Sequence, residues 1–331
     1  MIGYARHEVE RKAIAILKIL SESREPLGAR VIAQQLRGYG VDLRERAVRY
    51  HLKIMDERGL TELVGRDGRL ITESGVEELK NALVGDKVGL AISKVELLAF
   101  QTTFDWEKRS GHVPANVSFF PKEQFKKARG AMGDAFKAGI CVSDLVAVAD
   151  EGEKLAGVTV PEGKTGFATV CSIIINGALL KAGIPMDSKF GGLLQVRDHK
   201  PLRFVELIEY AGSSLDPSEV FINSRMTIVG EVARGGEGKV LANFRQIPAL
   251  CRPVAEEVIS GLREATLGGL LVMGDTSQSV CEIPVELNKI GIILLGGLNP
   301  VAAAVEAGIE VENTAMSGLI DYQDLVGFWQ L

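Results

Sequence analysis

The chain has few of the residues and motifs on which metal sites and enzyme active sites depend. It contains only four histidines and four cysteines among 331 residues, and neither type recurs at a metal-ligand spacing. No Gly-x-Ser-x-Gly elbow or Cys–His pairing is present. We therefore expect no metal site, no catalytic residues and no cofactor. The cysteines, expected as reduced and buried thiols, are Cys141, Cys171, Cys251 and Cys281.

Long apolar runs are also missing from the sequence. No stretch of about 18 apolar residues and no signal peptide can be found, so we expect a soluble, cytoplasmic protein with no membrane partner. Hydrophobic residues nevertheless make up 46% of the chain, which is enough for sizeable cores. The length allows two or three domains.

Positive charge is scarce overall but is concentrated at one end. The net charge is −5, which argues against a nucleic-acid surface along the whole chain. Residues 1–80 hold 15 Lys and Arg against 13 Asp and Glu, a charge of +2, so the rest carries −7. A mildly basic head on an acidic body predicts that only the head meets DNA.

The most informative segment is a basic stretch at residues 44–58. At helical spacing, Val48, Leu52 and Met55 form a narrow apolar stripe. Cations and an aromatic hydroxyl fall together on another face. A helix that reads the DNA major groove needs this division. The alternative is a solvated helix that happens to be basic.

The surrounding sequence favours a winged helix. An apolar helix around residues 13–20 and a short helix at 29–37 precede the basic helix, and Gly59 ends it. Strand-like runs at 61–64 and 69–72 are joined by a Gly-Arg-Asp-Gly turn, as in a hairpin. The predicted contacts to DNA, including two arginines at the wing tip, are Arg44, Arg46, Arg49, Tyr50, Lys53, Arg66 and Arg69.

The body of the chain contains an internal repeat. With a shift of 125 residues, segment 160–166 lies over 285–291, and with a shift of 127, segment 111–116 lies over 238–243. The identities are sparse, but they fall on glycines, prolines and the ends of expected elements. These positions have backbone reasons to persist after a duplication.

Each copy is predicted to fold in the order β-α-β-β-α-β. The first has strands at 113–119, 145–149, 166–170 and 192–196, with helices at 121–138 and 172–182. The second has strands at 240–246, 270–274, 291–295 and 316–321, with helices at 248–263 and 298–307. This order predicts an α/β (α+β) protein with two ferredoxin-like lobes. A single doubly wound sheet is the alternative. The expected domains are 1–82, 83–212 and 213–331.

Two similar lobes predict either a ligand cleft between them or a dimer interface. Ser172 and Asn299 each begin a helix after an apolar strand, where free N–H groups suit carboxylates. Ser188 and Lys189 lie in a run with two glycines, and Arg225 lies in an apolar, strand-like run at 221–226. These five residues are the candidate effector contacts. Ordinary helix caps and a glycine-rich turn are the structural alternatives.

Several long strings resemble the archaeal nitrogen-regulation repressors, the NrpR family, and their bacterial relatives. Glu-Arg-Ala-Val-Arg-Tyr-His-Leu-Lys at 45–53 and the wing at 65–75 match in the head. The body matches more specifically, at 166–172, 176–185, 190–192, 242–245 and 296–304, where the last string is Gly-Gly-Leu-Asn-Pro-Val-Ala-Ala-Ala. The similarity covers nearly the whole chain.

The resemblance implies a homodimeric repressor of nitrogen-assimilation genes that binds double-stranded operator DNA. It also implies that 2-oxoglutarate acts as the inducer, and the transcription machinery is a further expected partner. Two other functions remain open at this point. One is a small-molecule enzyme with a winged-helix head, against which the missing acid–base residues argue. The other is an adaptor whose winged helix binds protein.

Overall fold

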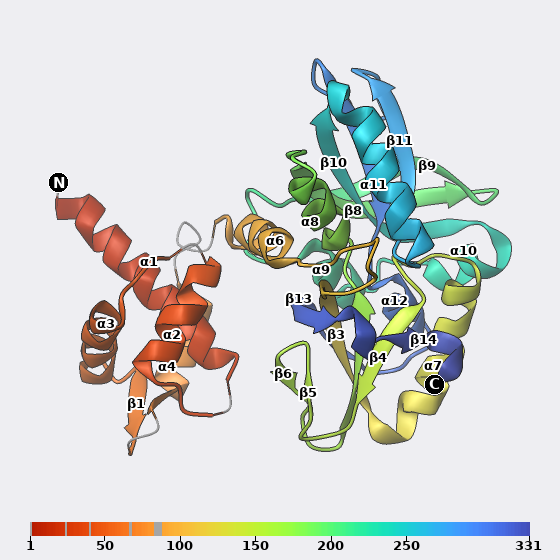
Figure 1. Ribbon diagram of the computed structural model, residues 1–331. Coiled ribbons are helices and arrows are strands. Elements are labelled where there is room, and N and C mark those ends of the chain that lie inside the picture. The colour runs from red at the N-terminus through yellow and green to blue at the C-terminus, as the bar shows by residue number, and fades with distance from the viewer. Residues whose placement is uncertain (1, 24, 40, 66–67, 83–87) are drawn as a thin grey trace. The chain divides into compact units, whose positions relative to one another are not determined.

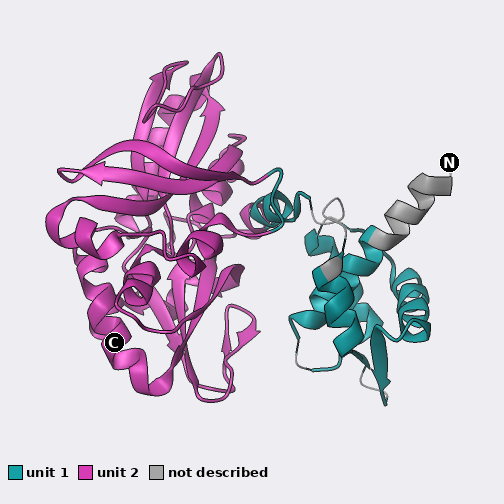
Figure 2. Ribbon diagram, turned by 180° about the vertical axis from the view of Figure 1, so that it is seen from behind, with its two compact units in different colours: residues 1–97, 211–214 teal, residues 98–210, 215–331 magenta. Residues whose placement is uncertain are grey.

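The computed structural model describes residues 2–23, 25–39, 41–65, 68–82 and 88–331, and it divides into two compact units (Figure 2). Unit 1 comprises residues 1–97 with 211–214, and unit 2 comprises residues 98–210 with 215–331. Helix α6 (Leu90–Gln101) contains the boundary between them. Each unit has its own hydrophobic core.

Unit 1 contains the predicted winged helix (Figure 1). Its elements are α1 (Ile2–Ser21), α2 (Ala29–Leu36), η1 (Arg37–Tyr39), α3 (Glu45–Glu57), β1 (Thr61–Val64), β2 (Gly68–Ile71) and α4 (Glu73–Asn81). The three helices bury apolar side chains against one another, with Ile16, Leu36 and Leu52 fully enclosed. Strands β1 and β2 pair antiparallel. Both the order of elements and the hairpin confirm the prediction.

Two glycines determine the backbone geometry of the hairpin and of the turn between α3 and the hairpin. Gly59 has φ +70° where α3 ends, the left-handed conformation expected of a helix C-cap. Gly68 has φ +142°, and a Cβ there would lie 2.3 Å from the carbonyl carbon of Leu27. The N–H and C=O groups of Leu27 and Arg69 bond to each other, both at 3.0 Å. Gly68 therefore lets a third segment join the hairpin.

Unit 2 contains two five-stranded sheets. The elements of the first copy are β3 (His112–Pro121), α7 (Lys122–Lys137), β4 (Leu145–Ala149), β5 (Lys154–Leu155), β6 (Val158–Thr159), β7 (Lys164–Val170), α8 (Ile173–Lys181), β8 (Asp187–Arg197) and β9 (Lys200–Glu209). Those that follow are α9 (Pro217–Asn223), α10 (Val229–Gly235), β10 (Gly238–Pro248), η2 (Ala249–Cys251), α11 (Arg252–Glu264), β11 (Leu270–Thr276), β12 (Lys289–Leu295), α12 (Asn299–Glu306), β13 (Glu312–Asp321), η3 (Tyr322–Asp324), β14 (Val326–Gly327) and η4 (Phe328–Gln330). Every strand and helix predicted for the two copies is present.

The two copies exchange their last helix and strand. One sheet has the order β13-β3-β7-β4-β14, and the other has the order β9-β8-β10-β12-β11. The fourth strand of each copy, β8 or β13, therefore pairs with the first strand of the other copy. The helices follow, because α7 packs against α12 and α11 packs against α8 (Figure 1). Each ferredoxin-like lobe thus takes residues from both copies, and one continuous core serves both sheets.

The chain crosses from one lobe to the other at two equivalent places, after β7 and after β12. At the first crossing, the N–H of Cys171 donates to the carbonyl of Pro114 at 2.8 Å. At the second, the N–H of Gly296 donates to the carbonyl of Leu241, also at 2.8 Å. These bonds are related by the shifts of 125 and 127 residues found in the sequence. The repeat is therefore visible in individual hydrogen bonds.

The structure corrects one predicted element. Residues 221–226 were expected as a strand, but α9 covers Pro217–Asn223. The side chain of Asp216 accepts hydrogen bonds from the N–H groups of Ser218 and Glu219, and Pro217 occupies the first turn. Asp-Pro-Ser-Glu is a helix-start pattern, and it outweighs the β-propensity of the apolar residues that follow.

Candidate functional site

The exposed face of α3 carries most of the residues predicted to contact DNA. Arg44, which caps the helix, Arg46 and Lys53 are exposed, and the side chain of Tyr50 is 65% exposed. The opposite face buries Val48, Leu52 and Met55, as predicted from their spacing. The helix therefore presents cations and a phenol to solvent while its apolar stripe anchors it.

Two of the cations on this face have acidic partners on the same helix. The guanidinium of Arg49 is paired with Glu45, four residues earlier. The ammonium of Lys53 lies 4.0 Å from the carboxylate of Glu57. All four side chains are well exposed, so each pair is weak and water competes for it. Arg49 and Lys53 can exchange these carboxylates for phosphates.

Arg69, predicted at the wing tip, lies instead against the end of α3. Its Nε donates to both carboxylate oxygens of Asp56, at 2.8 and 3.1 Å, and its side chain is only 19% exposed. This pair ties β2 to α3. A phosphate contact by Arg69 stays a prediction that would require this pair to open. Arg66 lies outside the described residues.

His51, on the same helix, faces the core and is 8% exposed. Burial lowers the pKa of His51 from its usual value, and the positive charge of Lys12 lowers it further. Both effects favour the neutral imidazole. His51 is therefore a packing residue and does not belong to the exposed basic face of α3.

In unit 2, a buried arginine lies where the first crossing meets β10. Arg245 is 1% exposed. Its Nη2 donates to Oγ of Ser172 at 3.1 Å, and its Nη1 lies 3.8 Å from the sulfur of Met186. Its Nε has no hydrogen-bond partner. A buried guanidinium with an unused donor is costly, and an anion placed beside it would remove that cost.

Other buried polar groups surround Arg245. Ser172 also accepts a hydrogen bond from Nδ2 of Asn243 at 3.2 Å, and Asn243 in turn accepts one from the hydroxyl of Tyr210. Burial raises the pKa of Tyr210, so it remains a neutral donor. Burial lowers the pKa of Arg245, whereas Tyr210 and Cys171 oppose that shift. No carboxylate is paired with Arg245 among the described residues.

Two of the five predicted effector contacts belong to this cluster. Ser172 bonds Arg245 directly. Ser188 stands opposite Arg245 in the pairing of β8 with β10, and its hydroxyl accepts a hydrogen bond from Nδ2 of Asn176 at 3.0 Å. The amide oxygen of Asn176 has no hydrogen-bond partner. We define the effector cluster as Ser172, Asn176, Ser188, Asn243 and Arg245.

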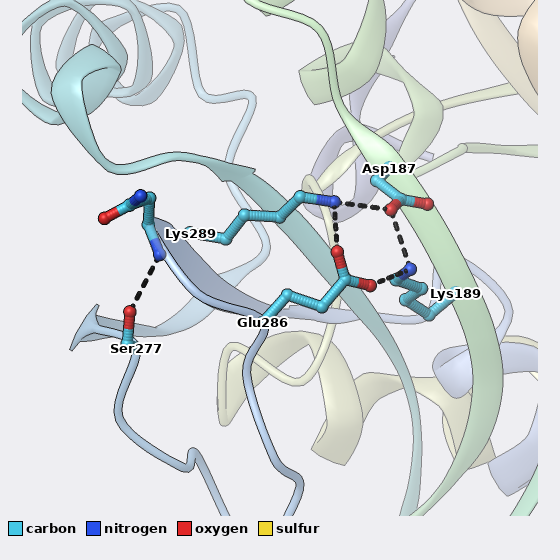
Figure 3. A network of polar contacts seen from close by, with 6 residues as sticks. Asp187, Lys189, Ser277, Glu286 and Lys289 are labelled. Carbon is cyan, nitrogen blue, oxygen red and sulfur yellow. Dashed lines mark hydrogen bonds and ion pairs between the residues drawn. The ribbon is translucent and has the colours of Figure 1, made fainter.

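Lys189 belongs to a different group of charges at the start of β8 (Figure 3). Its ammonium pairs with Glu286 and lies 2.7 Å from Asp187, while Lys289 lies 3.0 Å from Asp187 and 2.6 Å from Glu286. Hydrogen bonds from the two lysines lower the pKa of Glu286 to about 2. These four charges sum to zero and fasten the loop before β12 to β8. Lys189 is thus already neutralised.

The other two predicted effector contacts, Asn299 and Arg225, lie outside the effector cluster. Asn299 is fully buried, and its side chain accepts from the N–H of Leu241 at 2.8 Å and donates to the C=O of the same residue at 2.9 Å. Arg225 is exposed in the turn after α9, with φ +53°. Arg225 was chosen because it was expected inside an apolar strand, and that expectation is wrong.

The second crossing, after β12, has no cation at the position equivalent to Arg245. Ser118 occupies the position equivalent to Arg245 and donates to Oδ1 of Asn313 at 2.8 Å. Gly297 occupies the position equivalent to Ser172, and a Cβ there would lie 2.3 Å from the carbonyl oxygen of Val170. This crossing is closed and uncharged. Of the two related sites, only the first offers a positive charge.

Sequence reasoning missed Arg245, Asn243, Asn176 and Tyr210. A signal for Arg245 was present, because it lies in the apolar run Val-Leu-Ala-Asn-Phe-Arg-Gln-Ile at 240–247, predicted as a strand. A charged residue in a buried strand needs a partner or a ligand. This reason was given for Arg225, but it is Arg245 that lies in a buried strand. Tyr210 and Asn176 reach the cluster through tertiary contacts that no local pattern reveals.

The described residues contain no group of three or more His, Cys, Asp or Glu side chains placed to hold a metal ion. Within the same part of the chain, no helix is long and apolar enough to cross a membrane. The features that remain are a basic helix with a wing and a buried cationic cluster. They characterise a protein that combines a nucleic-acid-binding fold with a second unit that holds a buried cation.

Family models match both parts of the chain. Residues 88–326 match the model described as NrpR regulatory domains NRD1 and 2. Residues 14–79 match the model of the ribonuclease R winged-helix domain, which agrees with the fold of unit 1. The first match spans more than half of the chain.

Named relatives are similar over nearly the whole chain. The global nitrogen regulator NrpRI of Methanosarcina mazei is 41% identical, and the alignment covers 96% of this chain and 98% of the relative. The global nitrogen regulator NrpR of Methanococcus maripaludis is 33% identical over 94% of this chain, which spans only 54% of that relative. A crystal structure of a nitrogen repressor-like protein from Methanococcus jannaschii superposes with a TM-score of 0.61 at 28% identity, covering 72% of this chain and 98% of that one.

These matches define a winged-helix regulator and not an enzyme. The chain belongs to the NrpR family. The resemblance stated from its sequence strings is therefore confirmed, together with a mixed α/β fold built from a winged helix and two antiparallel sheets.

Proposed function

We propose that the protein is a transcriptional repressor of nitrogen-assimilation genes that binds double-stranded operator DNA and releases it when 2-oxoglutarate is bound. The basic face of α3 supports the DNA-binding part of this proposal. Family membership supports the nitrogen signal, because the named relatives are global nitrogen regulators. The transcription machinery is the further partner that repression would involve.

The observation that carries the inducer proposal is the unpartnered Nε of buried Arg245. 2-Oxoglutarate is a short dianion, and a carboxylate beside Arg245 would accept charge-assisted hydrogen bonds from the guanidinium. The hydroxyl of Ser172 already accepts hydrogen bonds from Asn243 and Arg245, so its hydrogen can be donated to the rest of the ligand. The cluster lies at the first crossing, where the chain leaves β7 and enters the lobe that contains β8 and β10. We retain Ser172 and Ser188 as effector contacts and replace Arg225 with Arg245.

Arg46→Ala is expected to weaken binding of every duplex, because Arg46 is exposed on α3 and has no ion pair among the described residues. Removing one cation that binds a phosphate should reduce the log–log salt slope by about 0.9. Fluorescence anisotropy with a duplex selected from a random pool measures both quantities. Millimolar 2-oxoglutarate should weaken wild-type binding to the same duplex.

Arg234→Ala is the matched control for this experiment, since it removes an exposed arginine from unit 2, where it pairs with Asp134. It should leave the affinity and the salt slope unchanged. Equal affinities for wild type and Arg46→Ala would rule out α3 as the DNA-contacting helix.

We also propose that the repressor is a homodimer, and that one contact surface is an apolar patch formed by Leu250, Val254 and Leu287. Leu250 is 96% exposed and Leu287 is 81% exposed. The N–H of Ala249 bonds the carbonyl of Asn288 at 2.9 Å, so the two segments that carry these leucines are adjacent. The equivalent positions on the other copy are Glu123, Lys127 and Glu162, so the fold itself does not require apolar residues here.

A second copy of the chain is the occupant that fits this patch. The neighbouring group of Asp187, Lys189, Glu286 and Lys289 has no net charge (Figure 3). A two-fold contact places the same surface on both partners, and alternating charges that sum to zero are complementary to themselves. A strongly charged partner would find no such match.

The double variant Leu250→Glu, Leu287→Glu introduces the residues found on the other copy and should convert the full chain from dimer to monomer. Buried like charges would oppose the contact and remove its apolar area. Sedimentation velocity at micromolar concentration measures the change. Leu63→Glu alters a leucine that is 61% exposed elsewhere and should leave a dimer. A double variant that stays dimeric would exclude the patch.

A further inference from the structure

Glu45 is an acidic residue in the N-terminal turn of α3, among the exposed cations Arg44, Arg46 and Arg49. It is the first residue of α3, after Arg44, and its side chain is 41% exposed. In helix-turn-helix proteins the N-terminal residues of the recognition helix are those that reach the base edges. If α3 enters the major groove, a carboxylate is therefore carried toward the bases, in a groove flanked by phosphates.

The pairing with Arg49 does not by itself account for an acid at this position. An exposed ion pair four residues apart stabilises a helix only weakly, and it also occupies a cation that could contact phosphate. Glu57 does the same for Lys53, but at the other end of α3, away from the N-terminal turn. Glu45 and Glu57 therefore carry the same charge and each pair with a cation, but they lie at opposite ends of α3.

A carboxylate in the major groove is unfavourable unless it accepts a hydrogen bond. The groove donors are amino groups, and the N4 amino group of cytosine is the partner that suits Glu or Asp. Against the acceptor atoms or the thymine methyl group of the groove, the carboxylate of Glu45 would be desolvated without compensation. Such a residue lowers affinity for random DNA and retains it where a cytosine is correctly placed.

We propose that Glu45 is a specificity-determining residue that accepts a hydrogen bond from a cytosine amino group in the operator and disfavours other sequences. This role rests on the proposed DNA-binding function. Released from Arg49 on binding, Glu45 leaves that guanidinium free for a phosphate or a guanine. On the correct sequence, the Glu45–Arg49 ion pair of the free protein is thus replaced by one contact of each side chain with DNA.

The test compares Glu45→Gln with Glu57→Gln in the full chain. Each is measured by anisotropy against a duplex selected by the wild-type protein from a random pool and against a scrambled duplex. Glu57→Gln should strengthen both complexes by the same factor, because it frees Lys53 without touching the bases. Glu45→Gln should strengthen only the scrambled complex, so that the ratio of affinities falls by about tenfold.

A second measurement identifies the base. Each C·G pair of the selected duplex is replaced in turn, and one replacement should weaken wild-type binding at least about fivefold while weakening binding by Glu45→Gln, which keeps only a neutral acceptor, much less. Selective binding by wild type with an unchanged ratio in Glu45→Gln would show that Glu45 only stabilises the helix and would overturn this role alone. Wild-type protein that binds no duplex selectively would overturn both this role and the proposed function.

Discussion

Replacing Arg245 with methionine should abolish the response to 2-oxoglutarate and leave operator binding intact. The substitution removes the guanidinium but keeps an unbranched side chain of similar length in a tightly packed strand. A buried cation without a carboxylate partner costs free energy, so Arg245→Met should melt at the same temperature as wild type or higher. The ligand should bind at least about a hundredfold more weakly, as expected when a desolvated charge pair is removed. Calorimetry of the full chain with 2-oxoglutarate measures it.

Arg225→Ala is the control for this prediction. Arg225 is exposed after α9, so its removal should leave the heat of binding and the release of DNA unchanged. Glutamate, with an ammonium in place of the ketone, should bind far more weakly than 2-oxoglutarate. Normal induction in Arg245→Met would place the effector elsewhere, and wild type that gives neither heat nor a thermal shift would exclude this inducer.

Separating the two copies should destroy the fold of unit 2. Residues 98–212 expressed alone would lack β13 and α12, leaving the long edge of β3 unpaired and α7 without its neighbour. Residues 213–331 would lack β8 and α8 in the same way. Unpaired edges and uncovered apolar faces favour aggregation. Neither fragment should give a cooperative thermal transition as a monomer, whereas refolding the two together should restore one.

The nicked full chain is the control here. Gly212 is exposed, and a Cβ there would meet no atom within 4 Å, so a protease site can be inserted at residues 212–213. After cleavage, the halves should remain associated through the exchanged strands and melt close to the intact protein. A half that is a folded monomer by light scattering and circular dichroism would contradict the interdependence described here.

Much of the fold could be predicted because its signals are local. The apolar stripe of α3, the cap at Gly59 and the Gly-Arg-Asp-Gly string of the wing each act within a few residues. The repeat placed the strands and helices of both copies in order. The exchange of β8 and β13 could not be predicted, because either partner for the fourth strand satisfies the same alternation of apolar residues. Whether the fourth strand of a copy pairs with β3 or with β10 depends on the path that the chain takes after β7 and after β12.

The candidate effector cluster was predicted only in part, for a related reason. Ser172 could be identified because it follows a buried strand and begins a helix. Arg225 and Arg245 looked alike, each an arginine within an apolar run, and the helix-start pattern at Asp216 was the feature that distinguishes them. Lys189 looked like a free cation, but it pairs with Asp187, two residues earlier, and with Glu286, about a hundred residues away in the sequence.

The difference between the two crossings bears on stoichiometry. The duplication produced two equivalent places, yet Ser118 and Gly297 leave one of them uncharged and closed. Under the proposed function, a single chain would hold one dianion, and its binding curve would have no internal source of cooperativity. Any Hill coefficient above one for the inducer must come from communication between chains. Under the same proposal, the steepness of the response to nitrogen status would be a property of the assembly and not of the single chain.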